Sequence, residues 1–185
     1  MMGLRAAFLS AAIVLFLQSS ATADAPSQFP LPRGIDTIVV PSGSPVRFAS
    51  MDEHGRASFK GRFVLSGTYY YGDNEYSDGP DVYLTLYFVP DPDIAARLPY
   101  FKIRGRPSVI FLNNSDTFVN AVVSRQTLAR LQKKGAPRAA GKIAIWADGF
   151  EARIECDAAE FRSRFVSIYK PARALVPANK QDFDC

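Results

Sequence analysis

Aromatic and basic side chains alternate along three segments of the chain in a pattern that could hold an anionic or sugar-like ligand. Six residues carry this pattern: Tyr70, Tyr83, Tyr87, Lys102, Arg104 and Arg106. Aromatic rings stack on flat rings of a ligand, and guanidinium groups hold phosphate, sulfate or carboxylate. We therefore predict a ligand-binding face. The alternative is that tyrosine is simply common in strands and that basic residues at a sheet edge block aggregation.

Carboxylates offer a catalytic alternative. Glu151 and Glu155 share a face of a predicted strand, with Arg153 between them, and two carboxylates about 5 to 9 Å apart can hydrolyse glycosides. Alternating opposite charges are more simply a solvated or cross-paired face. His54 stands in a polar segment, where it would need a nucleophile and an orienting partner to act as a base. We therefore assign no catalytic residue and expect no cofactor.

An acidic segment could attract a hard cation, because carboxylate oxygens are the ligands that Ca²⁺ prefers. Its members are Asp73, Glu75, Asp78 and Asp81. The twelfth position counted from Asp73 is Leu84, where a helix-loop-helix calcium loop places a bidentate glutamate. We therefore interpret the segment as a solvated acidic turn and predict no metal site.

The first 23 residues have the features of a secretory signal peptide. Arg5 precedes an apolar stretch at residues 6–17, and small residues lead up to Ala23. The stretch is shorter than the roughly 20 residues that cross a bilayer, so we expect no transmembrane segment in the mature chain. We expect an exported, soluble protein of the periplasm or the extracellular space. Because oxidising compartments favour disulfides, the two cysteines, Cys156 and Cys185, are predicted to pair.

The composition limits the remaining classes. The 185 residues are 48% hydrophobic, which suffices for a buried core in one domain. The net charge of +4 is far from the dense basic stripe of nucleic-acid-binding proteins, which argues against nucleic acid as a partner. One histidine and two cysteines are too few for most zinc sites and catalytic triads.

Period-two alternation predicts most of the elements that must position these residues. Residues 59–71 read as a long strand that Gly61 and Gly67 allow to curl. Ser124 is the expected N-cap of a helix at 125–134. Other strands are predicted at 82–89, 100–106, 109–112, 117–123 and 161–169, with a hairpin of 141–147 and 150–156 around an Asp148-Gly149 turn. If the first two strands are antiparallel neighbours, Tyr70 pairs with Tyr83 on the outer face.

These elements predict a mainly β fold, a small curled antiparallel barrel of the OB-like kind with one short helix between strands. A β-sandwich is the alternative. The predicted organisation has four parts: a signal peptide at 1–23, a proline-rich extended arm at 24–56 with at most one short strand, the barrel at 57–170, and a C-terminal tail at 171–185 that the disulfide tethers.

The favoured function is a non-enzymatic binding module. Its partner would be an anionic glycan, a lipid headgroup or a protein, held by the tyrosine and arginine face. A carboxylate-dependent hydrolase and a structural protein-interaction module are the alternatives.

Overall fold

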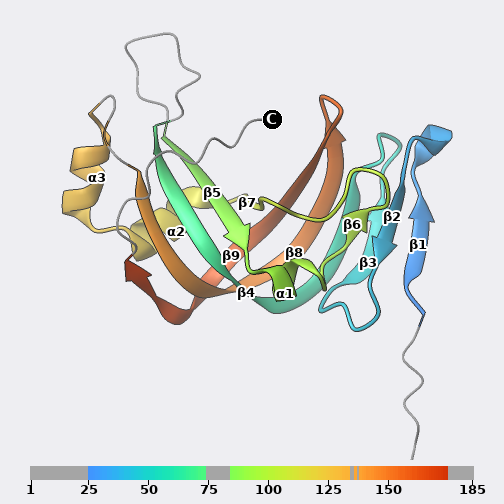
Figure 1. Cartoon of the computed structure of the whole chain (residues 1–185), viewed down its shortest axis with the longest axis horizontal. Helices are drawn as coiled ribbons and strands as arrows, with labels where there is room; N and C mark the ends of the chain where they lie inside the picture. Colours follow the sequence, from blue (N-terminus) through green and yellow to red (C-terminus); the bar gives the residue numbers. More distant parts are fainter. Residues whose placement is uncertain (1–24, 74–83, 134–135, 137, 175–185) are drawn as a thin grey trace, which may run out of the picture.

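The computed structural model describes residues 25–73, 84–133, 136 and 138–174. It is mainly β, as predicted, with strands in two sheets (Figure 1). The predicted signal peptide, most of the acidic segment and most of the tail lie outside the described residues.

The larger sheet consists of long curved strands (Figure 1). Its strands follow the order β3, β4, β8, β9, β7, and β5 pairs with the second half of β4. Their bounds are Arg47–Met51 for β3, Ala57–Asp73 for β4, Leu84–Pro90 for β5, Phe111–Leu112 for β7, Ala139–Glu155 for β8 and Ala158–Ala174 for β9. A single bridge from Phe88 to Ile110 links β5 to the residue before β7. The sheet therefore curls strongly, but the described residues form two sheets and not a closed barrel.

The smaller sheet is built largely from the segment expected to be an arm. It contains β1 (Ser27–Pro30), β2 (Thr37–Val40) and β6 (Tyr100–Phe101), and a short 3₁₀ helix, Pro32–Gly34, joins the first two. The prediction of at most one strand in residues 24–56 was wrong, because β1, β2 and β3 all lie there. The prolines fall at strand ends and in turns, where a missing N–H donor costs no ladder bond.

The alternation of β4 places its apolar set inside the curl, as predicted. Phe59, Phe63, Leu65 and Tyr69 are buried, while Lys60 is exposed on the other face. The inner face also receives Leu86 and Phe88 from β5. The predicted sorting into a dry and a wet face is therefore confirmed for the described part of these strands.

The register between β4 and β5 differs from the predicted one. Tyr70 pairs with Tyr87, and Thr68 pairs with Val89. Tyr83 lies outside the described residues. The shift is an even number of positions, so it exchanges partners without moving either side chain to the other face.

The described residues form three α-helices: α1 (Pro92–Ala95), α2 (Ser115–Val122) and α3 (Arg125–Leu131). The prediction of a strand at 117–123 was wrong, since α2 occupies it. Phe118 of α2 packs edge-on against Tyr69, Phe88 and Phe165. This packing outweighs the β propensity of the valines. The cap of α3 is as predicted, because the Ser124 hydroxyl accepts the Thr127 amide at 3.2 Å.

The predicted hairpin around Asp148-Gly149 was also wrong. β8 runs straight through both residues, and the chain turns instead at Cys156 and Asp157. These two residues have φ of 46° and 67°, as a two-residue hairpin turn of type I′ requires. Gly149, which has a φ of 68°, forms a β-bulge within β8 instead of a turn. A second bulge at Gly61 of β4 lies beside it.

Candidate functional site

The structure brings Tyr70 and Tyr87 together as cross-strand partners on the outer face of the large sheet. Tyr87 also lies 5.9 Å from the ring of Phe111 and 5.8 Å from the guanidinium carbon of Arg138. Their neighbour Tyr69 points into the core, where burial raises the pKa of its hydroxyl. The two outer tyrosines are therefore positioned by strand pairing, as the alternation predicts.

Arg104 holds the small sheet together. Its Nη1 lies 3.2 Å from Oδ2 of Asp36, whose side chain is fully buried. The Asp36 carboxylate also accepts the backbone amides of Thr37, Ile103 and Arg104. Burial alone would raise the pKa of Asp36, but these hydrogen bonds outweigh it and hold the pKa below its usual value. Arg104 is thus committed to an internal ion pair.

Lys102 and Arg106 lie in a turn and not on a strand. The predicted strand at 100–106 was wrong, because β6 ends at Phe101 and the chain folds back to bridge Phe101 with Gly105. Arg106 donates to the carbonyl of Ala96 at 2.6 Å and covers the ring of Tyr100. The side chain of Lys102 is exposed.

The outer tyrosines and the basic residues that follow β6 lie far apart along β8. Tyr70 pairs with Ala140 near the start of β8, whereas Nε of Arg104 donates to the carbonyl of Asp157, just beyond the end of that strand. The groups therefore lie near opposite ends of a strand of 17 residues. The described members of the predicted site do not form one face.

A cluster that sequence reasoning missed occupies the middle of the outer face. The guanidinium carbon of Arg62 lies 5.1 Å from the ring centre of Trp146, and the ring of Tyr169 packs edge-on against Trp146 at 5.3 Å. Lys170 lies 5.7 Å from the ring of Tyr169. Tyr169 is 48% exposed, so a ligand can reach the rings. We call these four residues the Trp146 cluster.

A hollow of about 330 Å³ lies beside the Trp146 cluster, at the two bulges. Asp148 of its lining is the cross-strand register partner of both Arg62 and Arg164. This register connects the hollow to the Trp146 cluster. The hollow is lined by Ser58, Phe59, Lys60, Asn113, Asp148, Gly149, Phe150, Glu151, Arg162, Ser163 and Arg164. Ser163 donates to the carbonyl of Gly149 at 2.6 Å and so braces the bulge.

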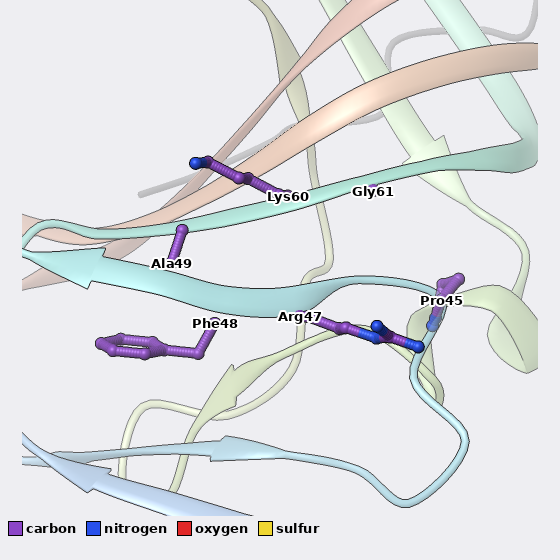
Figure 2. Close-up of a pocket in the computed structure, with 6 residues that line it drawn as sticks. All are labelled: Pro45, Arg47, Phe48, Ala49, Lys60 and Gly61. Atoms are coloured by element: carbon purple, nitrogen blue, oxygen red, sulfur yellow. The ribbon is translucent and has the colours of Figure 1, made fainter.

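A second hollow, of about 580 Å³, lies on the other side of Lys60 (Figure 2). Figure 2 shows Arg47 and Lys60, which are cross-strand partners, pointing away from each other. Gly61 is required here, since a Cβ on it would lie 2.7 Å from the carbonyl oxygen of Pro45. Phe48, which also lines this hollow, stacks on Phe29 of β1.

The carboxylates considered for hydrolysis are partly engaged in ion pairs. Arg153 lies 3.3 Å from Glu155 and 2.7 Å from Glu160, and Arg162 also pairs with Glu160. Such pairing is typical of a cross-paired face. His54 is exposed beside Glu53 in a turn.

The described residues offer neither a metal-binding cluster nor a membrane-spanning helix. In that part of the chain, no group of three or more histidine, cysteine, aspartate or glutamate side chains could hold a metal ion. None of its helices is long and apolar enough to span a bilayer. Cys156 is exposed in the turn between β8 and β9, and Cys185 lies outside the described residues, so the disulfide stays a prediction.

Comparison with known proteins gives no relative: no family model, curated protein or solved structure matches the chain. The function is therefore inferred from the outer face of the large sheet. Two features of the sequence are compatible with the Trp146 cluster. Arg62 alternates with the apolar set of β4, and Trp146 is the chain's single tryptophan.

Proposed function

We propose that the protein is an exported, non-enzymatic binding module that holds an anionic glycan on the outer face of its large sheet. The observation that carries the proposal is the Trp146 cluster, in which a guanidinium and two aromatic rings pack together on an accessible sheet face. Aromatic rings offer a flat apolar surface to a sugar ring, while cations at their edge attract its acidic groups.

The charges around the cluster support an anionic ligand. Exposed cations from three strands surround it on the outer face: Lys60, Arg62, Lys142, Arg164 and Lys170. Two of these have acidic partners, because Lys142 pairs with Asp91 at 3.1 Å and Arg164 pairs with Asp148. The others have no ion-pair partner among the described residues, which leaves a net positive surface beside the rings.

The single tryptophan allows a direct test. Fluorescence of Trp146 is recorded while the full chain is titrated with a galacturonic acid tetrasaccharide, with dextran sulfate and with neutral dextran. We expect the acidic saccharides to change the emission and neutral dextran to have little effect. Calorimetry on Tyr169→Ala should then show affinity lowered about tenfold, the value of one stacking contact.

A matched control comes from the same strand. Ile168 is 39% exposed but pairs with the buried Ile145 of β8, so Ile168→Ala removes an exposed apolar side chain outside the cluster and should leave affinity unchanged. Equal losses in the two variants would contradict the proposal. Binding to anionic phospholipid vesicles but to no saccharide would assign the face to a lipid headgroup and would also contradict it.

A further inference from the structure

Ion pairs engage several charged side chains that line the hollow beside the Trp146 cluster. Asp148 and Arg164 form one ion pair of its lining. Arg162 pairs with Glu160 just outside it. Charges neutralised in this way contribute little net attraction for a ligand, but they restrain the side chains that shape the hollow. Recognition must therefore come from other groups of the lining.

Four polar side chains of the lining remain available: Ser58, Lys60, Asn113 and Glu151. Within the described residues, none of these side chains forms a hydrogen bond or an ion pair. Glu151 lies directly between Ser58 and Arg162 in the sheet register, yet Arg162 turns to Glu160 instead. One cation, Lys60, and one anion, Glu151, therefore face the same hollow with no hydrogen-bond or ion-pair partner in the described part of the chain.

We infer that this hollow binds a sugar acid, meaning a sugar ring that carries one carboxylate and free hydroxyl groups. This inference rests on the proposed function and names the ligand class at the same face. The Lys60 ammonium pairs with the ligand carboxylate. The Glu151 carboxylate, which can only accept hydrogen bonds when ionised, takes those of ring hydroxyls. Ser58 and Asn113 complete a set of donors and acceptors.

Glu151 also makes the hollow selective. A polysulfated chain presents anionic groups at most positions and few free hydroxyls, so it would place negative charge against the Glu151 carboxylate. A volume of about 330 Å³ is at the small end of ligand sites, which span about 300 to 1,000 Å³. One sugar ring suits this space. The row of Arg62, Asp148 and Arg164 then leads the next ring toward Trp146.

The test compares a galacturonic acid tetrasaccharide with its carboxyl-reduced, neutral form by calorimetry. The wild-type chain should prefer the acid about tenfold, and Lys60→Gln should abolish that preference. Glu151→Gln should weaken binding of the acid about fivefold and strengthen binding of dextran sulfate. Lys133→Gln, an exposed lysine beyond α3, is the control and should change neither value. Thermal unfolding of each variant verifies that the fold is intact.

The possible failures can be told apart. If Lys60→Gln keeps the preference for the acid, or if Glu151→Gln leaves the binding of both saccharides unchanged, the inference is overturned. Should Trp146 emission still respond to acidic saccharides in that case, the proposed function stands without it. If no saccharide alters Trp146 emission in the wild-type chain, both are overturned.

Discussion

Arg104 reaches back 68 positions along the chain to Asp36, and the two side chains meet at 3.2 Å with the carboxylate fully buried. The same carboxylate accepts three backbone amides. The pair therefore fastens the turn after β6 to the start of β2. Arg104, which its type and spacing suggest as a ligand-binding residue, therefore stabilises the fold instead.

Arg104→Ala should destabilise the protein by about 3 kcal/mol, because removal of the guanidinium leaves the buried Asp36 carboxylate without a counter-charge. Lys102→Ala, two positions away on an exposed side chain, should change the free energy of unfolding by less than about 0.5 kcal/mol. Urea denaturation followed by circular dichroism measures both. Equal stability of the two variants would show that the ion pair contributes nothing.

Acid should weaken the fold through Asp36. Its pKa is lowered in the folded state, so as pH falls toward the unfolded value near 4 the unfolded chain takes up a proton that the folded chain does not. The stabilisation is complete above that pH and is lost as pH falls through the lower, folded pKa. Denaturation from pH 7 to pH 2 should show a shallower decline for Asp36→Asn, which starts from lower stability. Equal losses of stability with falling pH in the wild-type protein and in Asp36→Asn would contradict this role of Asp36.

Gly67→Ala should disrupt the pairing of β4 with β5. A Cβ at this position would lie 2.1 Å from the carbonyl oxygen of Val89 and 2.9 Å from Cα of Pro90, and neither backbone atom can move cheaply. We expect a loss of about 3 kcal/mol or more. Gly43→Ala is the comparison, since nothing lies within 4 Å of its new Cβ and only its positive φ costs about 1 kcal/mol. Thermal melting of both variants measures the difference.

The disulfide prediction has a geometric condition. Residues 175–185 can reach at most about 40 Å when extended, whereas the 17 residues of β9 would measure about 56 Å if straight. The curvature of β9 (Figure 1) shortens that distance, so a bridge within one chain requires the two ends of β9 to lie no farther apart than the tail can reach. Non-reducing mass mapping should find a peptide joining Cys156 to Cys185 in the monomer. Free thiols, or a Cys156 to Cys156 dimer, would refute it.

Local patterns predicted the features that depend on neighbours in the chain. The alternation of β4 placed Phe63 and Leu65 inside, because successive side chains of a strand point to opposite faces. Ser124 was recognised as a cap because its hydroxyl satisfies an amide three residues later. The strand at 161–169 is likewise part of β9. Each of these features needs only a short segment to be specified.

The predictions that the structure contradicts rest on local sequence patterns that are compatible with more than one structure. Asp148-Gly149 has the composition of a hairpin turn, but a glycine with positive φ also makes a bulge, and strands on both sides of β8 decided between the two. The segment that became α2 is rich in β-branched residues. It is a helix because Phe118 fits among rings from three distant strands.

By itself, the sequence determined the mainly β class, the inward face of the long strands and the outward position of Tyr70 and Tyr87. Only the tertiary structure decided which outward residues meet. Arg62 and Trp146 are 84 positions apart, and their contact depends on the register of β4 with β8. Register and sheet order arise from contacts between segments that are remote in the chain, and no periodicity within one segment encodes them.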